Sequence, residues 1–157
     1  MKILSTCALL AAMATLTVGC KKDDSTPTAS KTDMLTAKNW KVTADVTVAT
    51  ATGQAAVMTD NFATTVACER DNYFKFNADK TVIANEGTNV CSGSPQTANG
   101  VWDFNSDQTK LTMGTASSSG IVGQFDLKEL SATTLKISVT DTYNGVTEVE
   151  TLTFTAF

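Results

Sequence analysis

Two of the four cysteines in this chain are spaced so that they could form a covalent cross-link. The cysteines stand at positions 7, 20, 68 and 91. Between the last two, Asn77-Ala78-Asp79-Lys80 predicts a hairpin turn, across which residues whose numbers sum to about 157 face each other. Cys68 and Cys91 sum to 159, which places them nearly opposite at the open end of that hairpin. A redox pair would more often have C-x-x-C spacing, and a zinc site would need more ligands. We therefore predict a structural disulfide.

Histidine is absent from the chain. The usual general base at neutral pH is therefore missing, and Ser-His-Asp or Cys-His arrangements cannot form. The pattern Asp103, Asn105, Asp107 resembles the start of a calcium loop. However, Gln108 stands where that loop needs glycine, and Gly114 stands where it needs a bidentate glutamate. We expect no catalytic residues, no metal site and no cofactor, and we do not expect an enzyme.

Carboxylates gather near the last predicted hairpin, whose turn is Asn144-Gly145. Pairing across this turn places Asp141 opposite Glu148 on the inward face, with Glu150 beside them. Like charges directly opposite each other are destabilising. The group could be an acidic mouth for a cationic ligand, a carboxylate pair for acid–base chemistry, or a hairpin tip that projects into solvent. We favour the solvated tip, because most charge clusters are exposed.

Alternating patterns predict that β-strands make up most of the chain from residue 40 onward. Apolar residues at 40, 42, 44, 46 and 48 alternate with polar residues between them, which predicts one strand with all five on the same face. Seven further strands are predicted over residues 73–76, 81–85, 98–104, 109–113, 121–130, 134–141 and 146–155. Residues 34–39 could form one helical turn, and residues 49–67 form a long connection that holds a short helix or an irregular strand.

Eight strands joined mostly by short turns predict an all-β fold, an antiparallel up-and-down barrel, with a β-sandwich as the alternative. Pairing Phe104 with Thr109 would place Trp102 opposite Leu111 on the inward face. The interior of an eight-stranded barrel is either filled by side chains or holds one small ligand. The residues expected to face such a ligand are Trp40, Phe74, Trp102, Leu111, Phe125, Asp141, Glu148 and Glu150.

Residues 1–19 have the features of a secretory signal peptide, a positive charge followed by an uncharged apolar run. That run, Ile3 to Val18, is about sixteen residues long, which is short for a membrane-spanning helix. It ends in Leu16-Thr17-Val18-Gly19-Cys20, which resembles the lipobox of bacterial lipoproteins. The following Lys21-Lys22-Asp23-Asp24 resembles the charged surface-export tag of Bacteroidota lipoproteins.

This resemblance implies that Cys20 carries lipid and that residues 20–32 form a flexible tether. Two or three acyl chains hold a protein stably in a membrane. We therefore expect the protein to be anchored by lipid in the outer membrane or at the cell surface.

Residues 33–157 form the remaining domain, and about Leu35 to Phe154 of it resemble the lipocalin-like domain of Bacteroidota lipoproteins. The resemblance is carried by the run from Cys68 to Asp79, by Cys91, by the strand Gly100-Val101-Trp102-Asp103-Phe104, and by Leu130 to Leu135. It implies a barrel and placement at the surface or outer membrane. It does not imply a particular ligand.

The leading hypothesis for function is a non-enzymatic lipoprotein whose barrel binds a small, partly apolar ligand. The alternative is an interaction or assembly module with a filled core. A net charge of −4 disfavours nucleic acid as a partner. An apolar void of several hundred cubic ångströms would favour the ligand hypothesis. Acidic groups with raised pKa values inside that void would favour an enzyme.

Overall fold

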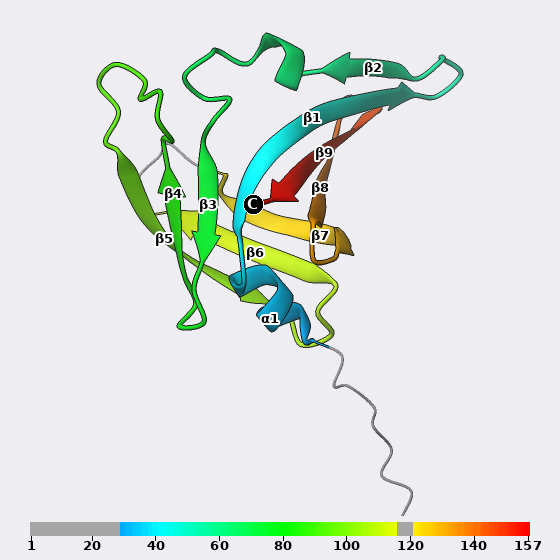
Figure 1. Cartoon of the computed structure of the whole chain (residues 1–157). Helices are drawn as coiled ribbons and strands as arrows, with labels where there is room; N and C mark the ends of the chain where they lie inside the picture. The colour runs from blue at the N-terminus through cyan, green and yellow to red at the C-terminus, as the bar shows by residue number, and fades with distance from the viewer. Residues whose placement is uncertain (1–28, 116–120) are drawn as a thin grey trace, which may run out of the picture.

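The protein is a closed eight-stranded antiparallel β-barrel. The computed structural model describes residues 29–115 and 121–157, and within them nine strands form one sheet in the order β2-β1-β3-β4-β5-β6-β7-β8-β9, closed by pairing of β1 with β9 (Figure 1). The elements are α1 (Lys31–Thr36), β1 (Asn39–Ala51), β2 (Val57–Asp60), η1 (Phe62–Thr64), β3 (Tyr73–Phe76), β4 (Thr81–Asn85), β5 (Thr97–Phe104), β6 (Lys110–Thr115), β7 (Gly123–Leu130), β8 (Thr134–Tyr143) and β9 (Val146–Ala156). All strands except β2 form the barrel, which excludes the sandwich alternative.

Helix α1 closes one end of the barrel (Figure 1). A capping box starts it, in which the Ser30 hydroxyl accepts from the backbone N–H of Asp33 while the Asp33 carboxylate accepts from the backbone N–H of Ser30. The helix therefore begins at Lys31, three residues before the predicted turn, and Lys31 is not part of a flexible tether. The predictions for residues 1–28, including the signal peptide and lipidation of Cys20, lie outside the described residues.

The hydrophobic core fills the half of the barrel next to α1. Its buried members are Leu35, Trp40, Phe74, Phe76, Val82, Trp102, Leu111, Met113, Phe125, Leu135, Ile137, Leu152 and Phe154. The aromatic rings meet edge to face, with centroids 5.9 Å apart for Phe74 and Phe154 and 5.8 Å apart for Phe76 and Trp102. This arrangement is the favoured one for the ring quadrupoles.

The register of the β8–β9 hairpin is as predicted, with Asp141 paired to Glu148. The β5–β6 register was predicted incorrectly, because Phe104 pairs with Leu111 rather than with Thr109. The side-chain oxygen of Asn105 accepts hydrogen bonds from the backbone N–H groups of Thr109 and Lys110, and these bonds keep Thr109 in the loop. The shift is two residues, so the inward face keeps its apolar side chains.

A β-bulge in β1 corrects the predicted alternation. Val42 pairs with Phe154 and Ala44 pairs with Thr153, which leaves Thr43 as an extra residue. Side chains before the bulge keep the predicted faces, and those after it are reversed. Asp45 therefore points into the barrel, whereas the valines at positions 46 and 48 point outward.

The segment between β1 and β3 covers part of the open end of the barrel (Figure 1). It contains strand β2, which pairs with residues 46–49 of β1, and the short helix η1. Asn61 fixes this segment to the barrel, because its side-chain N–H groups donate to Asp45 Oδ1 at 3.1 Å and to Thr47 Oγ1 at 2.9 Å.

The predicted Cys68–Cys91 disulfide is confirmed. It joins the segment before β3 to the connection between β4 and β5, with the two Cα atoms 5.1 Å apart. Both segments lie at the open end of the barrel, so the bridge holds them together there.

Candidate functional site: a cavity at the open end of the barrel

The half of the barrel away from α1 contains a cavity of about 640 Å³ that is open to solvent. Its lining residues come from the inward faces of the strands and from the segments at the open end. They are Val42, Asp45, Phe62, Thr65, Glu69, Asn72, Phe74, Glu86, Cys91, Ser94, Ile121, Val122, Gly123, Gln124, Phe125, Val139, Asp141, Glu150 and Leu152. Ligand pockets of proteins commonly range from about 300 to 1,000 Å³, so this one could hold a small molecule.

The floor of the cavity is apolar. Phe74, Phe125 and Leu152 belong both to the cavity lining and to the packed core below it. Val42 and Val139 are partly buried and pack against that core. The floor would therefore bury the apolar part of a ligand, at about 25 cal/mol for each Å² removed from water.

The charged residues of the cavity all have the same sign. Of the described residues that line it, five are acidic and none is lysine or arginine. The acidic residues are Asp45, Glu69, Glu86, Asp141 and Glu150. The ion pairs in the described part of the chain are Lys80–Asp103, Lys110–Asp126, Lys128–Asp126 and Lys136–Glu129, and none includes a cavity carboxylate.

Three of these carboxylates lie on adjacent strands, and we call Asp45, Asp141 and Glu150 the Glu150 cluster. In β9, Glu150 is paired with Thr47 of β1 and with Val139 of β8. Asp45 and Asp141 stand two residues from those partners, so each is a diagonal neighbour of Glu150. Diagonal neighbours in a sheet are about 7–8 Å apart at Cα, within reach of long side chains.

Glu150 has a perturbed acidity because it is half-buried beside other carboxylates. Burial raises the pKa of Glu150, and the charge of Asp45, a hydrogen bond shared with Asp45 and the charge of Asp141 raise it further. The folded protein therefore binds this proton more tightly than the unfolded chain. Stability then falls as the pH rises from the ordinary glutamate pKa through the higher folded value. Above this pH range, ionisation of Glu150 reduces the stability of the fold.

Of the eight residues that we expected to face a ligand, four line the cavity and four do not. Phe74, Phe125, Asp141 and Glu150 line the cavity. The other four, Trp40, Trp102, Leu111 and Glu148, do not line it. Trp40, Trp102 and Leu111 are at most 2% exposed within the core, because the end of the barrel next to α1 is filled by side chains.

The carboxylates of the last hairpin have different surroundings. The tip projects into solvent as predicted, and Glu148 is exposed there. Asp141 is also exposed but stands at the rim of the cavity. Glu150 lies two residues after Glu148 along β9, farther from the hairpin tip, and is half-buried. The solvated-tip interpretation was therefore wrong for Glu150.

Three cavity carboxylates were missed by the sequence analysis. Alternation placed Asp45 on the outer face, and only the bulge at Thr43 turns it inward. Glu69 and Glu86 lie in connections whose path depends on the disulfide and on hydrogen bonds such as that from the backbone N–H of Cys91 to Glu86 Oε2, at 3.2 Å. No local pattern marks these positions.

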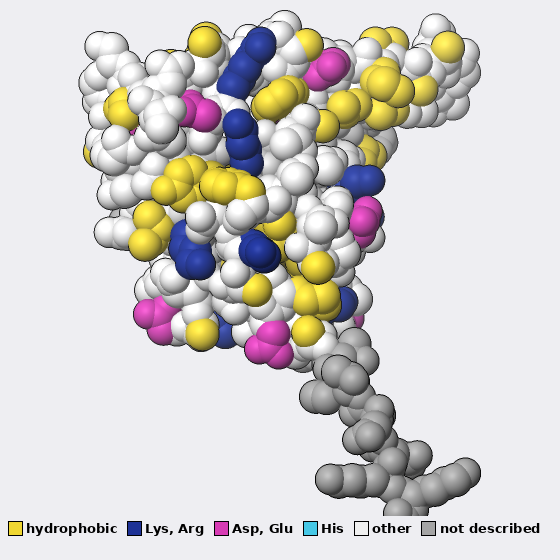
Figure 2. Space-filling model, viewed as in Figure 1, with side chains coloured by type: hydrophobic (Ala, Val, Ile, Leu, Met, Phe, Trp, Pro, Cys, Tyr) yellow, Lys and Arg dark blue, Asp and Glu magenta, His cyan; other side chains and the backbone are white. Residues whose placement is uncertain are grey.

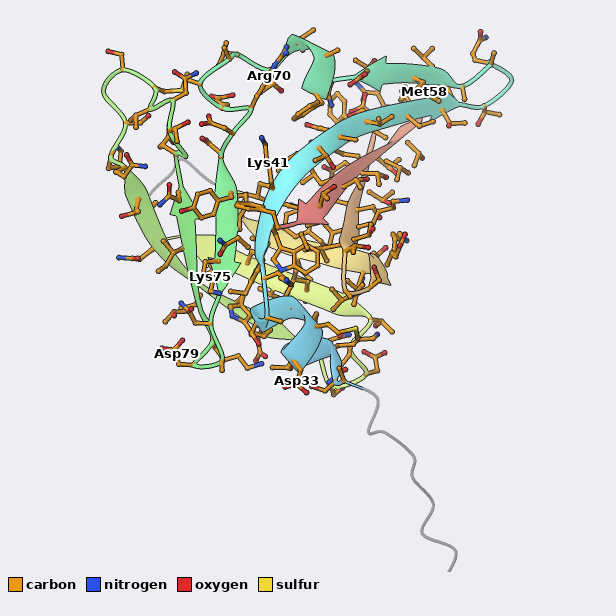
Figure 3. All side chains as sticks on the ribbon, viewed as in Figure 1. Asp33, Lys41, Met58, Arg70, Lys75 and Asp79 are labelled. Carbon is orange, nitrogen blue, oxygen red and sulfur yellow. A yellow bond between two sulfur atoms is a disulfide. The ribbon has the colours of Figure 1, made fainter. Side chains whose placement is uncertain are left out.

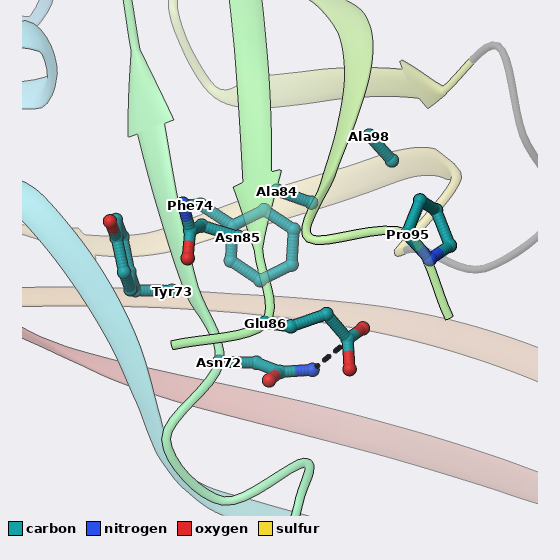
Figure 4. Close-up of a pocket in the computed structure, with 8 residues that line it drawn as sticks. All are labelled: Asn72, Tyr73, Phe74, Ala84, Asn85, Glu86, Pro95 and Ala98. Carbon is teal, nitrogen blue, oxygen red and sulfur yellow. Dashed lines mark hydrogen bonds between the residues drawn. The ribbon is translucent and has the colours of Figure 1, made fainter. Parts of the chain in front are cut away.

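A smaller pocket of about 40 Å³ adjoins the cavity (Figure 4). The Asn72 side chain faces the Glu86 carboxylate across it, and Phe74 and Pro95 contribute apolar walls. This volume accommodates little more than a water molecule. The large cavity is therefore the candidate site.

Over residues 29–115 and 121–157, no group of three or more His, Cys, Asp or Glu side chains is arranged to hold a metal ion. The same part of the chain contains no helix long and apolar enough to cross a membrane.

Comparison with protein families agrees with the barrel architecture. The family model described as a lipocalin-like domain matches residues 35–137. The chain belongs to the lipocalin-like domain family. The matched stretch of this lipocalin-like domain includes both bridged cysteines, Glu69 and Glu86, whereas Asp141 and Glu150 follow it. No curated protein sequence gives a significant match to the chain.

Proposed function

We propose that this lipocalin-like domain binds a small, partly apolar molecule in the cavity at the open end of the barrel. The observation that carries the proposal is a cavity of about 640 Å³ above an apolar floor. An assembly module with a filled core would not need such a void. The half of the barrel next to α1 has a close-packed core. The void in the other half is therefore a local feature and not a sign that the whole interior is poorly packed.

Binding of the neutral fluorescent probe N-phenyl-1-naphthylamine tests this proposal. Val139 lines the cavity, so in Val139→Trp the indole would occupy volume that the probe needs. We expect probe binding to weaken by about tenfold, which corresponds to about 1.4 kcal/mol. Val101→Trp is the matched control, because Val101 is 63% exposed on β5 and outside the cavity. Failure of the wild-type protein to bind the probe, or equal affinities for both variants, would contradict the proposal.

The proposal also includes a lipid anchor at Cys20, after removal of residues 1–19, and a location in the outer membrane or at the cell surface. It rests on the apolar run that ends at this cysteine and on the polar tether that follows. Ser30, which caps α1, lies at the closed end of the barrel, so a chain arriving from the membrane would leave the cavity facing outward (Figure 1).

Cys20→Ser tests the anchor. The variant should move from the membrane fraction to the soluble fraction and keep the circular dichroism spectrum of a β-protein, because lipid attachment needs the thiol but the barrel does not. Lys22→Ser is a matched control that should stay with the membrane. If the Cys20→Ser protein remains membrane-bound, Cys20 is not the anchor.

Two other functions have a specific observation in their favour. Val57 and Met58, 63% and 73% exposed on edge strand β2, could contact another protein. The raised pKa of Glu150 inside a cavity could serve acid–base chemistry. We rank both below ligand binding, because neither requires a large cavity with an apolar floor. The absence of histidine also leaves Glu150 without the usual partner for such chemistry.

A further inference from the structure

The interior and the exterior of the barrel differ in charge. Lys41 and Lys75 alternate with inward-facing residues of β1 and β3, so they point outward. Arg70 is exposed near η1, where its guanidinium donates to the backbone oxygens of Ala63 and Thr65 (Figure 3). Figure 2 shows lysine and arginine side chains together with aspartate and glutamate side chains on this outer face, so it carries both signs of charge. Inside, every charged side chain among the described residues that line the cavity is a carboxylate. A ligand in the cavity therefore meets negative charge alone.

We propose that the ligand of the cavity is an organic cation, an amine or quaternary ammonium group attached to an apolar body. This inference rests on the proposed ligand-binding function and specifies the chemical class of the ligand. The apolar body would contact Phe74, Phe125 and Leu152 on the floor. The cationic group would lie against the Glu150 cluster, toward the open end.

Repulsion within the Glu150 cluster lowers the stability of the fold, and a bound cation would relieve that repulsion. Burial raises the pKa of Glu150 most, and the charges of Asp45 and Asp141 raise it further, so the three carboxylates repel one another in the empty cavity. In the described part of the chain, no lysine or arginine pairs with these three carboxylates. Asp45 accepts a hydrogen bond from Asn61, which holds it in place but adds no charge. A ligand ammonium would supply the missing positive charge.

An organic cation fits this site better than a metal ion. The cluster's carboxylates are spread along three strands, and among the described residues they do not form a group suited to holding a metal. A metal ion would also leave the apolar floor below it without a function. A molecule with both an ammonium group and an apolar body uses both parts of the cavity.

Displacement of N-phenyl-1-naphthylamine by three competitors with the same ten-carbon chain tests the charge preference. The competitors are decylammonium, decanol and decanoate, each used below its aggregation concentration. We expect decylammonium to bind about tenfold more tightly than decanol, which is the size of one additional charge-assisted hydrogen bond, and decanoate to bind most weakly.

Two double variants assign this preference to the cluster. Asp45→Asn with Glu150→Gln should reduce the advantage of decylammonium over decanol to less than about threefold, while decanol affinity stays the same. Asp103→Asn with Glu129→Gln removes the same charge from exposed ion pairs outside the cavity and should keep the full preference. Because ionisation of the half-buried Glu150 opposes folding, the first variant should unfold at a temperature no lower than the wild type.

The outcomes separate this inference from the proposed function. If the probe and decanol bind but decylammonium has no advantage, the cavity binds ligands and the cation proposal is wrong. If the advantage survives Asp45→Asn with Glu150→Gln, another group recognises the charge and the cluster assignment is wrong. If neither the probe nor any competitor binds, the ligand-binding function itself fails.

Discussion

Replacing Trp40 with alanine is expected to lower the free energy of unfolding by about 3–5 kcal/mol, as for other large core aromatic residues. Trp40 is fully buried where α1 closes the barrel, and its indole Nε1–H donates to the backbone oxygen of Leu35 at 2.8 Å. The substitution removes both the packing of the ring and the bond that holds the helix to β1. Urea unfolding followed by circular dichroism measures the effect.

Trp40→Phe separates the two contributions. Phenylalanine keeps most of the apolar volume but leaves the Leu35 oxygen without this donor, so we expect a loss of about 1–3 kcal/mol. Trp40 lies outside the cavity, and folded Trp40→Phe protein should therefore bind N-phenyl-1-naphthylamine as the wild type does. A loss below about 1 kcal/mol for Trp40→Ala would mean that this end of the barrel is not closed by a packed core.

The second large effect is expected for removal of the disulfide. Cys68 and Cys91 are 23 residues apart, and closing a loop of this length stabilises a protein by about 3 kcal/mol in the chain-entropy model. The double variant Cys68→Ala with Cys91→Ala should therefore unfold at a clearly lower urea concentration, without a free thiol that could form other bridges.

The same variant should weaken ligand binding, because the disulfide joins two segments that line the cavity. Glu69 follows Cys68 directly, and Cys91 itself lies on the cavity wall. Wild-type protein treated with dithiothreitol is the control and should show the same loss of stability. If the double variant and the reduced protein keep the wild-type midpoint, the bridge does not constrain the unfolded chain to the extent we expect.

Features that depend on residues close in sequence were predicted well. Period-two alternation located the eight barrel strands, because successive side chains of a strand point to opposite faces. Asn144-Gly145 set the register of β8 and β9, because these residues tolerate the positive φ angles of a two-residue turn, here 51° and 77°. The disulfide was predicted from the same local pairing logic at the other hairpin.

Features that depend on contacts between distant segments were predicted poorly. The bulge at Thr43 arises from the pairing of β1 with β9, which lies more than a hundred residues later in the chain. The alternation of residue types in β1 does not predict it. The path of residues 61–72 depends on Asn61 bonding to Asp45 and on the bridge at Cys68. These contacts decide which carboxylates enter the cavity.

By itself, the sequence determined that this protein has antiparallel strands with apolar inward faces and one cross-link, since turn chemistry and alternation act over a few residues. It favoured a barrel over a sandwich, and the pairing of β1 with β9 decided between them. Only the tertiary structure decided which half of the interior is filled. Trp40, Trp102 and Leu111 pack the end next to α1, whereas Phe74 and Phe125 are left at the boundary of an open volume. The physical reason is that a cavity is the difference between the volume a closed sheet encloses and the volume of all the side chains that project into it. That difference depends on every strand at once, and one bulge changes it.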